Sequence, residues 1–210
     1  MKHYLLKITL AAALSLSMAV SALAQNADDA LAVVQNSVEV MLSDLKQNKA
    51  RYQQDSLALN QLIEGKMLPY FDETRMAAKA LGISVWKSAT PQQRRDFVNE
   101  FKSLLMRSYS TELLNYADAS VTYGQPVALD AKYTQVDANI TNSDGNSYQV
   151  SLKLRYNRRG QWLIVDVATE GFSFITSYGS QLKEKLETIG LQGVIDEYKA
   201  LNASGAVLQK

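Results

Sequence analysis

The stretch SYQVSLKLRYNRRGQWLIVDVA, residues 147–168, decides the fold class. Its first half alternates, and the apolar side chains that share one face are Tyr148, Val150, Leu152, Leu154 and Tyr156. A period of two is typical of a half-buried β-strand. The NRRG segment at 157–160 is typical of a tight turn, and residues 161–168 are apolar on both faces. The stretch predicts an antiparallel hairpin that turns its Val150, Leu152 and Leu154 face towards the core.

Two more strands are predicted before this hairpin. Residues 120–123 and 132–141 have the same period, and a loop at 124–130 that contains Pro126 separates them. The SDGN segment at 143–146 is a hairpin turn signal that leads into the next strand. Four consecutive strands joined by short connections indicate a four-stranded antiparallel meander.

Helical periodicity governs the rest of the chain. Apolar residues at steps of three and four predict helices at 27–46, 56–66, 73–81, 91–116, 172–188 and 191–202. The helix at 91–116 has the clearest start, because Thr90 can cap it, Pro91 suits the first helical position and Gln93 completes a capping box. This order indicates an α+β fold, a twisted four-stranded antiparallel sheet packed against helices. We expect the sheet to curl over the 91–116 helix.

The N-terminal segment is typical of a secretory signal peptide. A basic stretch at 1–7 precedes an apolar stretch at 8–20, and Ala22-Leu23-Ala24 supplies the small residues of a cleavage site. The apolar stretch is shorter than the roughly 20 residues that span a membrane. We therefore divide the chain into a signal peptide at 1–24, cleaved after Ala24, and a single domain at 25–210. An uncleaved anchor is the alternative.

Cleavage changes the chemistry that the protein has available. The whole chain has 22 basic and 21 acidic residues, one histidine, no cysteine and a formal net charge of +1. Removing Lys2, His3 and Lys7 leaves 20 basic residues (22 − 2) against 21 acidic ones and no histidine. This composition excludes Ser-His-Asp and Cys-His catalysis and removes the usual transition-metal ligands. We expect no cofactor, and the near-zero charge without a basic block argues against nucleic acid as a partner.

Asp166 is the carboxylate that invites a catalytic interpretation. It interrupts the apolar strand at 161–168, and simple alternation puts it on the same face as Trp162 and Ile164. A carboxylate buried in an apolar pocket can abstract a proton, as in an isomerase. The alternative is a structural acid at the end of a strand, bonded to the backbone or paired with an arginine.

Two basic groups have similarly open interpretations. Lys153 and Arg155 run into Arg158-Arg159, and a second pair, at 94–95, lies near the start of the long helix. Each group suits an anionic headgroup or an acidic partner surface, or is simply solvated. The apolar residues are also ambiguous, because they suit either a filled core, as in an adaptor protein, or a core that opens to admit an apolar ligand.

Several motifs occur in a familiar order. They are Leu68-Pro69-Tyr70, then KSATPQQR at 87–94, then Phe97, Phe101, Leu105, Tyr109 and Leu113 at steps of four, and later Trp162, Asp166 and EGFSFI at 170–175. In this order after a signal peptide, over about residues 27–202, the chain resembles the MlaC, or toluene-tolerance, family of periplasmic phospholipid-binding shuttle proteins. It departs from that family at 178–180 (YGS), where many members have a basic residue after the aromatic.

The resemblance implies a fold similar to nuclear transport factor 2, with an apolar ligand cavity between sheet and helices. It implies a monomeric carrier, not an enzyme, that binds diacyl glycerophospholipid by its acyl chains. Its partners would be an outer-membrane lipoprotein–porin complex and the substrate-binding ring of an inner-membrane ABC transporter. Its role would be to maintain the lipid asymmetry of the outer membrane. From periodicity and chain order we expect the acyl-chain contacts to be Phe101, Leu105, Tyr109, Val150, Leu152, Leu154, Trp162, Ile164, Phe172 and Ile175.

Overall fold

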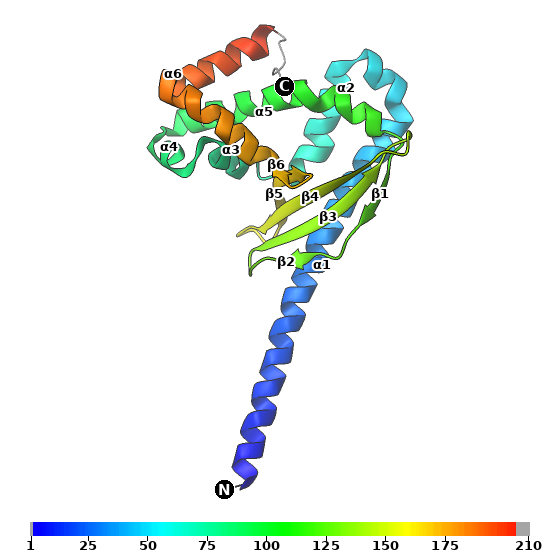
Figure 1. The fold of residues 1–210 in the computed structure, drawn as a ribbon, viewed down its shortest axis with the longest axis vertical. Helices are drawn as coiled ribbons and strands as arrows, with labels where there is room; N and C mark the ends of the chain where they lie inside the picture. The colour runs from blue at the N-terminus through cyan, green and yellow to red at the C-terminus, as the bar shows by residue number, and fades with distance from the viewer. Residues whose placement is uncertain (1, 205–210) are drawn as a thin grey trace.

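The computed structural model describes the backbone of residues 2–204 and the side chains of residues 27–204. Figure 1 shows a twisted sheet lying along one long helix, with the other helices gathered at one end of the sheet. The predicted signal peptide at 1–24 lies outside the residues whose side chains are described. Within residues 27–204, no helix combines the length and the apolar character needed to cross a membrane.

The sheet contains the predicted meander and two further short strands. The strands β1 (Ser120–Tyr123), β3 (Tyr133–Thr141), β4 (Ser147–Tyr156) and β5 (Trp162–Thr169) lie side by side in chain order, all antiparallel. Strand β2 (Val127–Ala128) also pairs with β3, inside the predicted loop, and β6 (Phe172–Ser173) pairs with β5. Strands of two residues are too short to show alternation, so the sequence did not predict them.

A tight turn explains why β6 forms where a helix was predicted to begin. Glu170 and Gly171 have φ values of 51° and 82°. Positive φ at both central residues is the requirement of a two-residue hairpin turn of type I′. Ser173 then caps the last helix, because its hydroxyl oxygen accepts a hydrogen bond from the backbone N–H of Thr176 at 3.1 Å. The helix therefore begins at Phe174, two residues later than predicted.

The helices follow the predicted pattern with local differences. They are α1 (Lys2–Gln54), α2 (Ser56–Leu62) with its π-helical and 3₁₀ continuations η1 (Ile63–Met67) and η2 (Leu68–Tyr70), α3 (Glu73–Leu81), α4 (Ile83–Ser88), α5 (Pro91–Leu113) with the 3₁₀ turn η3 (Leu114–Tyr116), and α6 (Phe174–Ser204). The predicted capping box is confirmed, with both Thr90–Gln93 hydrogen bonds at 3.1 Å. The predicted break at Gly190 is a kink within α6, where φ is 66°.

Helix α1 extends past the predicted end at residue 46. It bends at Asn48, whose φ and ψ are −116° and 16°. The Asn48 side chain donates hydrogen bonds to the backbone oxygen and the carboxylate of Asp44, at 3.3 and 2.9 Å. Such a side chain competes with the helix for backbone acceptors, which explains a bend rather than an end.

Three groups of buried apolar side chains form the core. The sheet cluster joins one sheet face to α1 and contains Ala30, Val34, Val136, Leu152, Leu154, Trp162 and Ile164. The helical cluster joins α3, α5 and α6 and contains Ala77, Ala80, Leu81, Phe97, Phe101, Leu104, Ile175, Tyr178, Leu182, Val194, Ile195 and Tyr198. The α2 cluster joins the end of α1 to α2, η1 and η3 and contains Met41, Leu45, Tyr52, Ala58, Leu59, Leu62, Ile63, Leu114 and Ala117.

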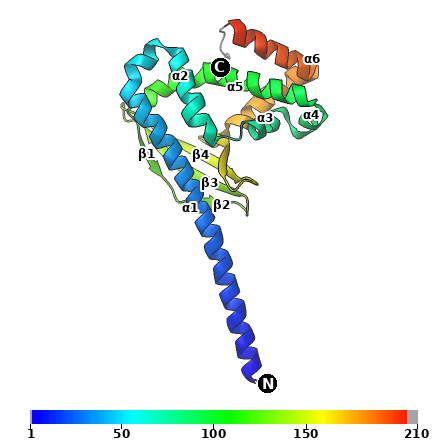
Figure 2. The same cartoon turned by 180° about the vertical axis from the view of Figure 1, so that it is seen from behind.

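The helix packed on the inner face of the sheet, the face that carries Leu152 and Leu154, is α1. We expected α5 in this place, and Figure 2 shows α1 running across the sheet while α5 lies among the other helices. The aromatic stripe of α5 packs against α6 instead, with Phe97 and Phe101 both stacked on Tyr198. Both helices have an apolar stripe, so the choice between them depends on how the chain folds back.

The stability of the helical cluster should decrease at alkaline pH. Burial, with a smaller effect of the Glu197 carboxylate, raises the pKa of Tyr198 to about 12. Burial and the hydrogen bond with Tyr109 also raise the pKa of Tyr178 above its usual 10. Because these pKa values are higher in the folded protein than in the unfolded chain, the protonated tyrosines stabilise the fold fully below pH 10. This stabilisation is lost as the pH rises towards 12, because only the unfolded chain releases the phenolic protons in that range.

We expect the free energy of unfolding to fall by about 2–3 kcal/mol from Tyr198 over this range. Urea unfolding followed by circular dichroism between pH 8 and about pH 12 checks this. Tyr198→Phe should flatten the dependence, and a slope that is the same in both proteins would contradict the assignment.

Candidate functional site

The inner face of the sheet is buried at its centre, where Leu154 is 0% exposed beneath α1. At one end of this face Tyr156 is 37% exposed. Towards the other end Val150 and Val167 are only half-buried, while Tyr148 is 38% and Phe172 is 75% exposed. We call Tyr148, Val150, Val167 and Phe172 the open end of the inner face. Large apolar side chains gathered on one surface are typical of a site that contacts another protein, a membrane or an apolar ligand.

Strand register brings Phe172 to this surface. Val150 pairs with Thr169, and Thr169 pairs with Phe172. Residues directly opposite each other in antiparallel strands project from the same face, so these three side chains form one row across β4, β5 and β6. The tight turn at 170–171 holds the exposed phenylalanine at the end of this row.

Aromatic side chains from the helices border the open end. On one side, Tyr116 of η3 packs edge-on against Tyr148, with ring centroids 6.3 Å apart. On the other side, Phe174 follows β6 directly and packs edge-on against Tyr109 of α5 at 5.5 Å. The Tyr109 and Tyr178 hydroxyl groups share a hydrogen bond of 2.7 Å. The side chains on both sides are therefore aromatic.

The structure divides the ten expected contact residues between two clusters. Five lie on the inner face of the sheet, namely Val150, Leu152, Leu154, Trp162 and Ile164. Four belong to the helical cluster or pack against it, namely Phe101, Leu105, Tyr109 and Ile175. Phe172 lies in β6 and is exposed. Val150 and Phe172 thus lie at the open end, and an acyl-chain contact by any of the ten stays a prediction.

A β-bulge hid one residue of the open end from the sequence pattern. The β4–β5 register shifts between Lys153 and Leu154, and Val165 is the extra residue of β5. Beyond it, Val167 pairs with Leu152 and shares the inner face. Simple alternation from Trp162 assigns Val167 to the other face. A bulge adds one residue to one strand, and nothing in the residue types of 162–169 marks it.

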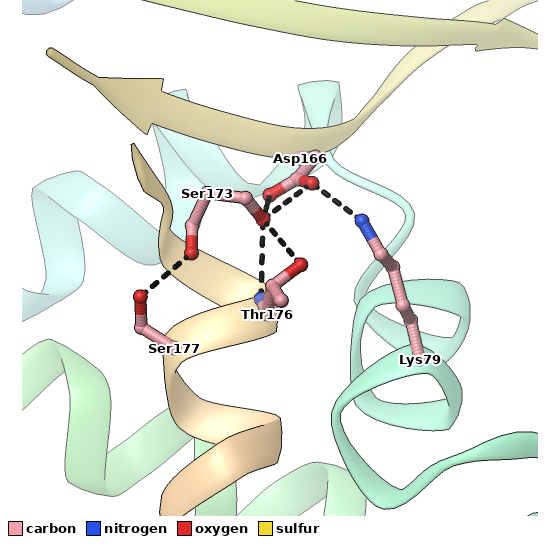
Figure 3. Close-up of polar contacts among 5 residues, drawn as sticks. All are labelled: Lys79, Asp166, Ser173, Thr176 and Ser177. Carbon is pink, nitrogen blue, oxygen red and sulfur yellow. Dashed lines mark hydrogen bonds and ion pairs between the residues drawn. The ribbon is translucent and has the colours of Figure 1, made fainter. Parts of the chain in front are cut away.

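Asp166 lies on the opposite face from Trp162 and Ile164, so the expected position was wrong. The bulge places it opposite Lys153. Its carboxylate accepts hydrogen bonds from the Lys79 ammonium at 2.6 Å and from the Ser173 hydroxyl at 2.7 and 2.9 Å, as Figure 3 shows. The side chain is 10% exposed. Asp166 therefore ties α3 and the start of α6 to β5, with a lysine where an arginine was expected.

Asp166→Asn should lower the free energy of unfolding by about 1–3 kcal/mol, because it removes a charge-assisted hydrogen bond from a mostly buried carboxylate. Urea unfolding of the purified protein measures this loss. The matched control is Asp144→Asn in the exposed β3–β4 turn, where a change within about 0.5 kcal/mol is expected. Equal effects of the two substitutions would contradict a structural role.

The charged groups offer little beyond this network. The Lys153 ammonium and the Arg155 guanidinium lie 5.0 and 5.9 Å from the centre of the Tyr133 ring, so both rest against an aromatic face. Arg158 and Arg159 are exposed in the β4–β5 turn. Within residues 27–204, no three acidic or histidine side chains are grouped to hold a metal ion.

Comparison with known proteins identifies the family. The family model described as MlaC protein matches residues 35–200. The chain belongs to the MlaC family. Its relatives include the toluene tolerance protein Ttg2D of Pseudomonas putida, which is 27% identical over 75% of this chain and 73% of that protein. Another is the intermembrane phospholipid transport system binding protein MlaC of Haemophilus influenzae, 25% identical over 68% of each chain.

A solved structure of similar fold confirms the architecture of this MlaC-family chain. It is a phospholipid-binding protein from Ralstonia solanacearum in complex with a phospholipid. The two folds superpose with a TM-score of 0.77 at 26% identity, over 84% of this chain and 98% of that one. The α+β fold expected from the sequence is therefore confirmed, with two more strands than the four predicted.

Proposed function

We propose that this MlaC-family protein is a carrier that binds a diacyl glycerophospholipid by its acyl chains. The observation that supports this best is the open end of the inner face, where Tyr148 and Phe172 expose large apolar surfaces beside half-buried Val150 and Val167. The similar fold of a protein solved with a phospholipid supports a phospholipid as the ligand. No catalytic step is part of the proposal.

The proposed role is transport through the periplasm. The signal peptide at 1–24 would export the chain, and cleavage after Ala24 would release it as a monomer. The carrier would exchange lipid with an outer-membrane lipoprotein–porin complex and with the substrate-binding ring of an inner-membrane ABC transporter. This exchange would maintain the lipid asymmetry of the outer membrane.

The free energy of lipid transfer sets what such a carrier must provide. Two acyl chains of about sixteen carbons expose roughly 30 methylene and methyl groups, which would cost about 24 kcal/mol to bring into water. Only an apolar environment nearly as good as the bilayer makes transfer close to neutral. The acyl chains would therefore lie between the inner face of the sheet and the helices, away from water.

The division of the core makes such entry feasible. The sheet cluster and the helical cluster are separate groups of buried side chains. Half-buried apolar residues pack against the edge of each cluster, Val150 and Val167 on the sheet and Tyr109 and Phe174 on the helices. Acyl chains that contact these residues would add apolar contacts to each cluster without disrupting its buried side chains. The headgroup would stay near solvent, so the site needs no dedicated charged pocket.

The test is the lipid content of the purified protein. The full chain is expressed in a Gram-negative host and purified from the periplasm without detergent. Mass spectrometry and phosphorus analysis of an organic extract should find near-stoichiometric diacyl phospholipid, and the intact mass should correspond to a chain that begins at Gln25. A folded protein that carries no lipid and takes none from phospholipid vesicles would instead support the adaptor alternative.

The isomerase alternative requires that Asp166→Asn abolish activity, and activity that survives the substitution would exclude it. Because both carboxylate oxygens are hydrogen-bonded on the outer face of the sheet, no observation favours proton abstraction by this group. The substituted protein should retain its lipid, since the change lies outside the inner face.

A further inference from the structure

A second concave surface lies among the helices. It is a cleft of about 450 Å³ lined by Thr74, Trp86, Pro91, Arg94, Arg95, Val98 and Asn99. These residues come from α3, α4 and the start of α5, which Figure 1 shows at the end of the molecule away from β1 and β2. None of them belongs to the inner face of the sheet. The cleft is therefore distinct from the surface proposed to bind lipid.

Hydrogen bonds hold the aromatic wall of this cleft in place. The Arg94 guanidinium lies 5.5 Å from the centre of the Trp86 ring. The same group donates hydrogen bonds to the backbone oxygen of Trp86 at 2.8 Å and to that of Lys87 at 2.9 Å. These bonds satisfy the last carbonyl groups of α4 and fix the indole against the guanidinium. The sequence predicted no helix at 83–88, and this anchoring by Arg94 accounts for it.

The charge around the cleft is positive and largely uncompensated. On α3, the charged neighbours form ion pairs elsewhere, Glu73 with Lys102 at 3.4 Å and Arg75 with Asp72 at 3.3 Å. Among residues 27–204, no carboxylate lies within ion-pair distance of Lys87, Arg94 or Arg95.

The α5 terminus strengthens this charge. Its first turn contains no acidic residue, so the positive end of the helix dipole adds to the two guanidinium groups. Asp96, the acid nearest along the helix, accepts a hydrogen bond from the Gln92 amide at 2.6 Å, and Gln92 in turn accepts one from Arg95 at 2.6 Å. Arg94 is bonded to the α4 carbonyl groups, so Arg95, which is exposed and has no ion pair among residues 27–204, is the guanidinium available to an anionic ligand.

We propose that this cleft is a docking site for an acidic protein segment that carries an aromatic or aliphatic side chain. The apolar side chain would lie on Trp86, Pro91 and Val98, and the carboxylates would pair with Arg95 and Lys87. Tryptophan and arginine are the residues that most often dominate the binding energy of protein interfaces, and opposite charge fixes orientation and raises the association rate. Because the cleft is separate from the open end, a partner can dock there while lipid is bound.

The experiment measures binding of a synthetic peptide to the purified, exported chain. The probe is a fluorescein-labelled peptide with acidic residues on both sides of a Phe-Leu pair, and fluorescence anisotropy at low salt follows its binding. We expect saturable binding that Arg95→Glu and Trp86→Ala each weaken by about tenfold or more. Arg95 is exposed, so its replacement should leave the fold intact, which circular dichroism verifies.

The matched control reverses charge elsewhere. The double variant Arg158→Glu, Arg159→Glu alters an exposed basic pair in the β4–β5 turn, and it should bind the peptide like the parent protein. Three results would each overturn the proposal. They are equal weakening by the control variant, no binding of the peptide, and unchanged binding of a peptide in which Gly-Gly replaces the Phe-Leu pair. Arg95-dependent binding to phosphatidylglycerol vesicles, with none to the peptide, would overturn it in favour of a membrane surface. No arm requires bound lipid, so the result is independent of the proposed carrier function.

Discussion

Val150→Arg is expected to remove co-purifying phospholipid while the protein stays folded. Val150 lies at the centre of the open end, half-buried and in the same row as Phe172. A guanidinium there can turn to water in the lipid-free protein, but it must be desolvated when acyl chains cover the site. The ratio of lipid to protein in organic extracts should fall about tenfold or more, since 1.4 kcal/mol suffices for each factor of ten.

The control is Gln149→Arg, which adds the same charge to the exposed opposite face of β4 and should leave lipid content unchanged. Leu152→Arg should also abolish lipid binding, but Leu152 is buried in the sheet cluster, so it would destabilise the fold as well. Unchanged lipid in a folded Val150→Arg protein would show that the open end is not the entry point.

Phe101→Ala is expected to lower the free energy of unfolding by about 3–5 kcal/mol. Phe101 is 3% exposed, stacks on Phe97 at 5.3 Å and meets Tyr178 edge-on at 5.5 Å. Removing the ring leaves a cavity among neighbours that are themselves packed. Urea unfolding should give the same loss with and without bound lipid, because these protein contacts account for the burial of the ring.

Phe172→Ala provides the contrast, since a ring that is mostly exposed should contribute within about 0.5 kcal/mol to the stability of the lipid-free protein. It should instead weaken lipid retention. A Phe101→Ala loss that appears only in the lipid-loaded protein would place Phe101 against the acyl chains rather than in the core.

These two variants distinguish a core residue from a surface residue that the sequence pattern did not distinguish. Phe101 and Phe172 were expected to contact lipid on the same grounds, as aromatic residues at helix positions in a family-like order. The structure places one inside the helical cluster and the other on a two-residue strand at the surface. The difference depends on the turn at 170–171, where Glu170 adopts a positive φ that its residue type does not indicate.

The long strands and the capped helix were predictable because their signals are local. Alternation at 148–156 and the capping box at 90–93 each depend on residues a few positions apart, and both were confirmed. The covering helix was not predictable in this way. Helices α1 and α5 both present apolar stripes, and only the folding back of the chain assigned α1 to the sheet and α5 to α6.

The sequence by itself determined the α+β class, the order of the four main strands and membership in the MlaC family. Only the tertiary structure decided which apolar residues are core and which are exposed. The bulge at Val165 turned Val167 inward and Asp166 outward, to Lys79 and Ser173. The physical reason is that burial is a property of the neighbours that long-range contacts supply, whereas periodicity records only which side chains share a face.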